Sequence, residues 1–262
     1  MSRDNRRVSA KLFLLKELVV RDIRSRYAGS GLGVVWAVLH PILWMVLYTA
    51  VFSVVLRVPV ERGFATFPEF LMPGLLAWMA IHEGIARSAS ALPDNAAVVK
   101  KAVFPVDTLV LAVVLAAVVN QLVAFLVFGV YVGFLGHLSP GWILLALPAL
   151  GLQLLLTYGI GCFAATLTAF SRDTGQAIGI LLTIGFFATP IVYPASLVPE
   201  RYRPLLEANP IAHLVSWYRA AFTLHTLPSP GSIIYLTVFA LAAAVLGGGL
   251  FQRARPHFAD LI

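Results

Sequence analysis

Long apolar runs separated by short polar interruptions are the main pattern of the chain. Most runs contain no Asp, Glu, Lys or Arg, and the one exception is interrupted by His82, Glu83 and Arg87. A helix needs about 20 apolar residues to cross a hydrocarbon core of about 30 Å. The pattern therefore predicts an all-α membrane protein, a single domain over residues 1–262, with six transmembrane helices at residues 31–56, 70–92, 108–135, 141–170, 174–198 and 232–251.

The segment before the first run, residues 8–27, has a helical periodicity. Its apolar residues recur every three or four positions and so form one stripe: Val8, Leu12, Leu15, Val19 and Ile23. Glu17 can pair with Arg21, and Asp22 with Arg26, each one turn later. We predict an amphipathic interface helix at the cytoplasmic membrane surface. Such a helix can be a lipid anchor or a docking surface for a cytoplasmic partner, and the pattern leaves both open.

Residues 94–104, which follow the second run, predict a short cytoplasmic helix. Asp94 or Asn95 can cap its start, and Phe104-Pro105 ends it. The helix is partly apolar, which suits insertion into a groove of a partner protein. A solvated connecting loop is the alternative, but such a loop would not need this apolar content.

Residues 199–224, on the outer side, predict two short re-entrant helices between the fifth and sixth spans. Several prolines exclude one continuous helix, and Asn209-Pro210 is a strong helix start. A helix over 211–224 would be about 21 Å long at 1.5 Å per residue, which is too short to span. The pair can dip into the outer leaflet and return where protein or water surrounds its backbone groups.

Composition and charge agree with this topology. Hydrophobic residues make up 60% of the chain and charged residues 12%, whereas a soluble domain carries about a quarter charged residues. With the N-terminus inside, fourteen of the 19 Lys and Arg residues fall on the inner face. The five on the outer face are Arg57, Arg62, Arg201, Arg203 and Arg219. This bias predicts that both termini are cytoplasmic.

The chain carries no recognisable catalytic motif. It contains no Gly-Lys dipeptide, so the phosphate-binding loop of P-loop ATPases is absent. The six histidines are scattered, which predicts no metal site and no cofactor in this chain. The basic residues do not interleave with aromatics as in a nucleic-acid groove, so no nucleic-acid partner is expected. The one cysteine, Cys162, lies within an apolar run, and we predict that it is a small buried hydrophobic residue rather than a reactive thiol.

Glu83 is the one carboxylate deep inside a predicted span, which makes it a functional candidate. Arg87 lies one turn further on the same face and can neutralise it, so we favour a structural ion pair.

Aromatic residues form the second candidate feature of the spans. They can be an interfacial belt or a surface on which sugar rings stack and slide. The candidate path residues are Trp36, Trp44, Tyr48, Phe52, Phe186, Phe187 and Tyr193.

Taken together, the chain resembles the permease subunit of type 2 ABC transporters that export polysaccharide. The resemblance covers nearly the whole chain and depends on the order and spacing of several motifs. They are LKEL at residues 15–18, RDIRSRY at 21–27, SGLGVVW at 30–36, His40-Pro41, KKAVFP at 100–105, TPIVYP at 189–194, Asn209-Pro210 and Tyr218-Arg219.

The resemblance implies two permease copies and two copies of a separate ATPase subunit, which binds ATP and Mg²⁺. It implies that residues 8–27 contact the ATPase, that 94–104 form a coupling helix, and that 199–224 form outer gate helices. The implied ATPase-interface residues are Lys16, Glu17, Arg21, Arg24, Arg26, Tyr27, Asn95, Lys100, Lys101 and Phe104. The implied outer-gate residues are Tyr193, Asn209, Pro210, Trp217, Tyr218 and Arg219.

The expected cargo is a lipid-linked polysaccharide crossing the bacterial inner membrane. The TPIVYP and Asn-Pro segments lean towards O-antigen or teichoic acid over capsule. A type 2 permease for drugs or lipids would share the fold. An integral-membrane acyltransferase would need a buried catalytic His or paired carboxylates, which the sequence does not offer.

Overall fold

The computed structural model describes residues 3–33, 35–61, 63–100, 105–138, 141–171, 173–224 and 226–262. All regular elements in these ranges are helical. The longer helices are α1 (Arg3–Tyr27), α2 (Val35–Tyr48), α3 (Phe67–Ser90), α5 (Asp107–Phe134), α6 (Trp142–Phe170), α7 (Asp173–Ala188), α9 (Pro210–Arg219) and α10 (Pro230–Ala254). The shorter ones are α4 (Ala96–Val99), α8 (Arg203–Glu207), α11 (Phe258–Leu261), the π-helical segments η1 (Thr49–Val55) and η5 (Ala220–Leu224), and the 3-10 turns η2 (Pro93–Asn95), η3 (Ala195–Leu197), η4 (Glu200–Tyr202) and η6 (Arg255–His257).

Four helical stretches within the described ranges are long and apolar enough to cross a membrane. They are Val35–Val55, Asp107–Phe134, Trp142–Phe170 and Pro230–Leu261. Helix α3 has sufficient length but carries Glu69, Glu83 and Arg87, and α7 is apolar but has only 16 residues. The two other predicted spans therefore do not qualify by length and composition, and a six-span topology stays a prediction.

The ends of the helices differ from the predicted ranges for local reasons. Helix α3 begins at Phe67 because Thr66 accepts a hydrogen bond from the Glu69 backbone, while the Glu69 side chain accepts from the Thr66 backbone. Helix α7 ends at Ala188, well before residue 198, because Pro190 cannot donate to a helical ladder. The Thr189 hydroxyl donates instead to the Gly185 carbonyl.

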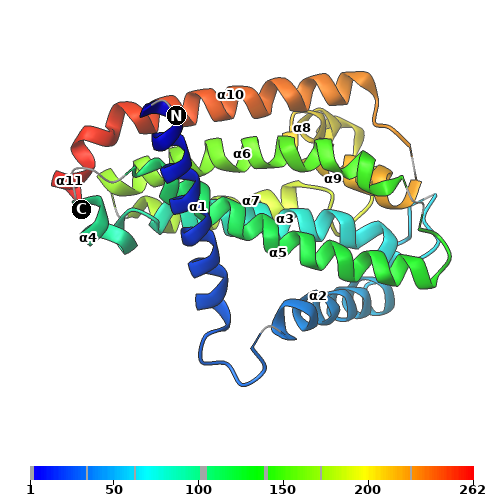
Figure 1. The fold of residues 1–262 in the computed structure, drawn as a ribbon. Coiled ribbons are helices and arrows are strands. Elements are labelled where there is room, and N and C mark those ends of the chain that lie inside the picture. Colours follow the sequence, from blue (N-terminus) through cyan, green and yellow to red (C-terminus); the bar gives the residue numbers. More distant parts are fainter. Residues whose placement is uncertain are drawn as a thin grey trace.

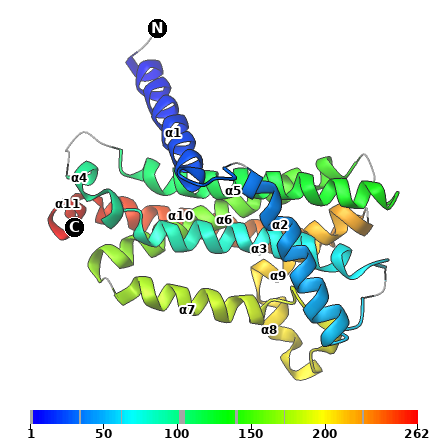
Figure 2. The same cartoon turned by 90° about the horizontal axis from the view of Figure 1, so that it is seen from below.

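Helices α3, α5, α6 and α10 form a bundle whose axes run in one general direction (Figure 1). Helix α1 crosses one end of this bundle at a steep angle and packs mainly on α5 (Figures 1 and 2). Helix α2 lies at the edge of the bundle against α5, and its other side is exposed. Helix α7 lies on another flank, against α3 and α6 (Figure 2).

Two apolar clusters hold the two ends of the bundle. The larger cluster joins α3 and α5 to α9 and η5, and includes Phe70, Phe125, Phe128, Tyr218 and Phe222. The smaller cluster joins α1, α4, α5, α10 and α11 through Leu18, Leu92, Val99, Phe251 and Phe258. One end of the molecule is therefore a single packed body, which consists of helix α1, the 93–99 segment and the C-terminal end of the chain.

The tightest helix contact is between α6 and α10, which pack over a long shared face. A β-carbon at Gly247 would lie against the carbonyl oxygen of Gly159, and one at Gly159 would lie against the backbone of Ala243. The helices can approach so closely only because both positions lack side chains.

We expect Gly247→Val to separate α6 from α10 and to destabilise the folded protein by about 2 kcal/mol, as overpacking does. Thermal unfolding in detergent would measure the loss. Gly249→Val is the matched control, because a β-carbon at Gly249 in the same helix would meet no atom within 4 Å. Equal stability of the two variants would contradict the close contact.

Candidate functional site: an aromatic cavity between α2, α3, α5 and α7

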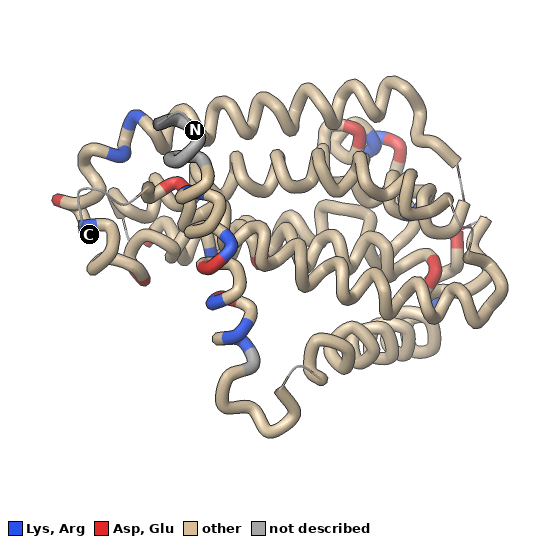
Figure 3. The backbone as a smooth tube through the Cα atoms, viewed as in Figure 1, with Lys and Arg blue, Asp and Glu red and all other residues tan. Residues whose placement is uncertain are grey.

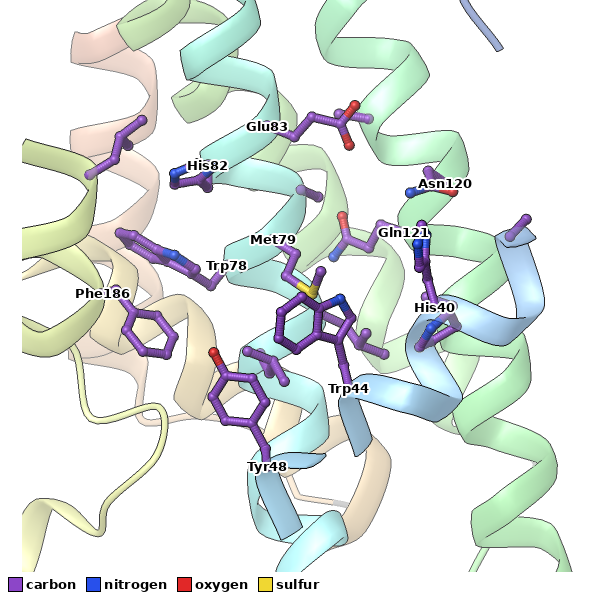
Figure 4. A pocket seen from close by; sticks show the side chains of 18 of the residues that line it. His40, Trp44, Tyr48, Trp78, Met79, His82, Glu83, Asn120, Gln121 and Phe186 are labelled. Carbon is purple, nitrogen blue, oxygen red and sulfur yellow. The ribbon is translucent and has the colours of Figure 1, made fainter. Parts of the chain in front are cut away.

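A cavity of about 550 Å³ lies between α2, α3, α5 and α7 (Figure 4). Each of the four helices contributes to its wall, so the site exists only in the folded bundle. The lining side chains that matter for its chemistry are His40, Trp44, Tyr48, Trp78, Met79, His82, Glu83, Asn120, Gln121, Thr183, Phe186 and Phe187.

One part of the wall is a chain of aromatic rings. The Trp44 and Tyr48 ring centroids are 5.5 Å apart along α2, and Tyr48 meets Phe186 of α7 edge-on at 6.4 Å. Trp78 of α3 lies 5.9 Å from Phe186. Phe187 follows at 5.1 Å from Phe186, and 61% of its surface is exposed. The rings offer flat apolar faces from three helices to a ligand.

The other part of the wall is polar. His40, His82, Asn120 and Gln121 carry imidazole and amide groups, and Thr183 adds a hydroxyl. Such groups both donate and accept hydrogen bonds. A cavity that combines flat rings with hydrogen-bond donors and acceptors suits a ligand that has hydroxyl groups and apolar faces.

The structure brings four of the seven predicted aromatic path residues to this cavity, namely Trp44, Tyr48, Phe186 and Phe187. The others lie elsewhere. Trp36 donates from its indole to the Ser30 hydroxyl at 3.0 Å, and Phe52 stacks on Tyr48 beyond the cavity wall. The Tyr193 hydroxyl donates to the Phe187 carbonyl and so closes the end of α7.

Sequence reasoning missed the rest of the wall. Trp78, Met79 and His82 belong to α3, whose apolar character hid which face is turned inward. Asn120 and Gln121 stand side by side in a run of Val, Leu and Ala, and two adjacent amides within such a run are the signal that could have drawn attention to them.

Gln121 is also part of a buried polar group. Its side-chain amide exchanges two hydrogen bonds with that of Gln153 in α6, at 3.1 and 2.7 Å. The Tyr218 hydroxyl, which is fully buried, donates to the Gln153 carbonyl oxygen at 2.7 Å. The three side chains join α5, α6 and α9 behind the cavity.

The residues predicted for the outer gate act as anchors of α9 in the structure. The Asn209 side chain accepts from the Ile211 backbone and donates to the Thr189 hydroxyl, both at 2.9 Å, with Pro210 as the first helical residue. The Trp217 indole donates to the Leu145 carbonyl at 3.0 Å. That these residues form a gate stays a prediction.

Arg219 is buried, with 5% of its surface exposed. Its guanidinium donates to the Phe70 and Ile191 carbonyls, each at 2.8 Å, and lies 3.8 Å from the centre of the Phe70 ring. It therefore ties α9 to the start of α3 and to the irregular segment after α7. The charge count of the sequence had placed this side chain simply on the outer face.

The residues predicted to face an ATPase fall into three groups. Lys16, Glu17, Arg21, Arg24 and Lys100 are exposed at the end of the bundle where α1 lies. Asn95 donates to the Ala91 carbonyl and accepts from Arg21 at 3.4 Å, and Arg26 forms ion pairs within the chain. Lys101 and Phe104 lie outside the described residues, as does the side chain of Tyr27.

The predicted pairs Asp22–Arg26 and Glu83–Arg87 are confirmed, with nitrogen–oxygen distances of 3.0 and 3.3 Å. Glu17 and Arg21 form no ion pair among the described residues, and Arg21 donates instead to Asn95. The structure adds two ion pairs that the sequence did not predict, Arg26 with Glu83 and Arg87 with Asp22. Burial alone would raise the pKa of the Asp22 carboxyl. The hydrogen bonds and charges of Arg87 and Arg26 outweigh burial and hold this pKa below its ordinary value.

Comparison with known proteins gives the class to which this arrangement belongs. The family model described as "ABC-2 type transporter" matches residues 14–223, and the chain belongs to this family of transporter membrane proteins. The resemblance inferred from the motifs is thereby confirmed.

Individual relatives are similar over almost the whole chain. An O-antigen export system permease protein RfbA of Myxococcus xanthus is 33% identical over 255 residues, which is 95% of each chain. A protein of the same name from Klebsiella pneumoniae is 29% identical over 253 residues, again 95% of each chain. The polysialic acid transport protein KpsM of Escherichia coli is 24% identical over 239 residues, 91% of this chain and 92% of its own.

Proposed function

We propose that this chain is the membrane-spanning subunit of an ATP-driven exporter that moves a lipid-linked polysaccharide, O-antigen in the first place, across a bacterial inner membrane. The observation that carries the proposal is the cavity of about 550 Å³, in which aromatic rings and neutral polar groups share one wall. The near full-length similarity to permeases named for O-antigen export supports the choice of cargo.

In the proposed topology, α3 and α7 join the four apolar stretches as the second and fifth spans, and α8 and α9 are re-entrant on the outer side. Helix α3 would carry Glu69 in its first turn and Arg87 in its last turn, while Glu83, further inside, is paired with Arg26 and Arg87. Helix α7 would be completed by the irregular segment after Ala188. Charged residues lie mainly towards the two ends of the tube in Figure 3, and α1 carries more of them than any other helix. The end that holds α1, α4 and α11 would be cytoplasmic, by the excess of Lys and Arg there.

The chemistry of the cavity fits a glycan. Sugar rings have C–H faces that pack on aromatic faces, and their hydroxyls need donors and acceptors such as the amides of Asn120 and Gln121. A wall without unpaired charge would let repeating units pass without strong binding at any one step.

The power would come from a separate ATPase subunit, because the chain has no phosphate-binding loop. The docking face would be the exposed basic residues of α1 together with Lys100 at the end of α4. The ATPase subunit would bind ATP and Mg²⁺, and two ATPase copies would serve two permeases.

A second copy of this chain would cover the exposed side of α2. That side is rich in large apolar residues, among them Val38, Ile42 and Val46, while α2 has few contacts with its own bundle. Lipid can also cover such a face. A second copy would in addition enclose the open side of the cavity next to α2.

The test is to delete the gene, to measure surface glycan, and to restore the gene with an affinity tag. Loss of the glycan on deletion, its return on complementation, and co-purification of an ATPase subunit are the expected results. Nucleotide hydrolysis by the purified chain alone would contradict the proposal, as would unchanged surface glycan in the deletion strain. Loss of a capsular glycan instead of O-antigen would keep the transport role and change the cargo.

We expect Lys100→Glu to weaken retention of the ATPase about threefold or more, because reversing a charge at the rim of an interface slows association. Lys100 is exposed at the end of α4. Co-purification at two salt concentrations would measure the effect. The matched control is Arg201→Glu, an exposed cation in η4, which lies with α8 at the other end of the bundle. Equal retention in both variants would remove the docking role of α4.

A further inference from the structure

Four charged side chains form a closed ring between α1 and α3. Asp22 and Arg26 are one turn apart on α1, and Glu83 and Arg87 are one turn apart on α3. Arg26 contacts both carboxylates, and so does Arg87. Each charge therefore has two opposite charges as neighbours, and the ring carries no net charge.

The ring joins the helices at two points. The cross-helix contacts are Asp22 with Arg87 and Arg26 with Glu83, so the residue order on α1 is reversed on α3. One contact would be a pivot about which the helices could turn. Two contacts spaced by a helical turn on both sides resist sliding and rotation together.

The ring is the main link between α1 and α3. The backbone of α1 packs on α5, and Leu18 anchors it in the apolar cluster with Leu92 and Val99. Among the described side chains, the hydrogen bonds and ion pairs that reach α3 from α1 are those of the ring. Loss of the ring would therefore leave α1 in place on α5 but would free it from α3.

The ring also touches the cavity. Glu83 lines the cavity wall, and Met79, one turn away on the same face of α3, lines it too. A second cavity of about 340 Å³, next to α1, is lined by Arg26 and shares Ala37 and Asn120 with the first. The ion pairs thus connect α1 directly to the helix that forms the cavity wall.

We infer that Asp22, Arg26, Glu83 and Arg87 are positioning residues that transmit the movement of the docked ATPase from α1 to the cavity wall of α3. The inference rests on the proposed function, because it needs an ATPase that moves α1. It adds a second route of transmission beside the 94–104 segment. This role does not depend on which residue of a cross-helix pair is acidic and which is basic. It requires only that the two residues of each cross-helix pair carry opposite charges.

The test exchanges charges within each helix. Asp22→Arg with Arg26→Asp keeps the pair within α1 and its net charge, but turns both cross-helix contacts into like-charge contacts. Glu83→Arg with Arg87→Glu does the same from α3. All four substitutions together restore opposite charges across the helices. The charge bias that sets topology is unchanged in every case.

The readouts are surface glycan per amount of membrane complex, and ATP hydrolysis by the purified complex with its ATPase. We expect either exchange alone to lower glycan output per complex about tenfold while ATP hydrolysis falls less than twofold, since contacting charges couple strongly. The fourfold variant should return output to within about twofold of the wild type. The control exchange is Arg253→Asp with Asp260→Arg, both exposed near the C-terminus.

Three outcomes would overturn the inference. The first is an unchanged ratio of glycan output to ATP hydrolysis in both exchanges. The second is a fourfold variant whose glycan output is no higher than that of either exchange alone. The third is a reduced amount of complex with normal glycan output per remaining complex. If the exchanged variants do not assemble, the variant Asp22→Asn with Arg87→Gln removes one cross-helix contact and leaves the other. An unchanged ratio of glycan output to ATP hydrolysis in that variant decides against the ring. Absence of ATPase binding or glycan export in the wild type would instead overturn the proposed function.

Discussion

Replacing Arg219 by methionine is expected to cost the folded protein about 4 kcal/mol. The substitution removes the donors to the Phe70 and Ile191 carbonyls, which lie in a buried part of the molecule. The Ile191 carbonyl belongs to an irregular segment, so no helical partner is available to replace Arg219. An unsatisfied buried carbonyl costs about 1–3 kcal/mol, and the loss of the contact with the Phe70 ring adds to this.

Thermal unfolding in detergent and the yield of membrane-inserted protein would measure the effect. Arg219→Lys should be intermediate, because one ammonium group cannot reproduce the planar fork that reaches two carbonyls. The control is Arg201→Met, since Arg201 is an exposed arginine that also lies over an aromatic ring. A methionine variant as stable as wild type would mean that burying the cation costs as much as its contacts contribute.

Removing three rings of the cavity should reduce surface glycan at least tenfold, and up to about a hundredfold. The variant is Trp44→Ala, Tyr48→Ala and Phe187→Ala, all at the cavity wall. If each ring contributes about 0.5–1.5 kcal/mol to contacts with the passing glycan, the three together exceed the 1.4 kcal/mol that corresponds to a factor of ten. Assembly with the ATPase should persist, because none of the three residues belongs to α1 or to the end of α4, where docking is proposed.

Quantification of surface glycan, normalised to the amount of membrane complex, is the measurement. Each single variant should show a smaller loss than the triple one. Phe163→Ala is the matched control, since Phe163 is an exposed ring on α6 outside the cavity wall. Normal display in the three single variants and in the triple variant would exclude this aromatic surface from the glycan path.

The local elements were largely predictable because their signals are local. The periodicity of residues 8–27 gave α1, and the capping and proline signals gave the start of α9 at Pro210. The ends were less accurate where one residue decides them, as at Pro190 after α7. Helix α4 is shorter in the described residues than the predicted 94–104 segment, whose last residues lie outside the description.

The candidate site was predictable only in part. Trp44, Tyr48, Phe186 and Phe187 could be chosen from the aromatic pattern, because that pattern marks faces of single helices. The pattern could not show that Trp78 completes the same wall. Helix α3 is buried on nearly all of its sides, so its pattern could not show which face lines a cavity.

The sequence by itself determined that this protein is helical, lies in a membrane, carries a basic amphipathic helix before its first span, and belongs to a family of transporter membrane proteins. Run length, helical period and motif order encode these properties within short stretches of chain. Only the tertiary structure decided that Arg219 and Tyr218 are buried, that four helices enclose one cavity, and that Asp22 meets Arg87 across 65 residues. These contacts depend on which helix faces pack together, and no local pattern specifies that choice.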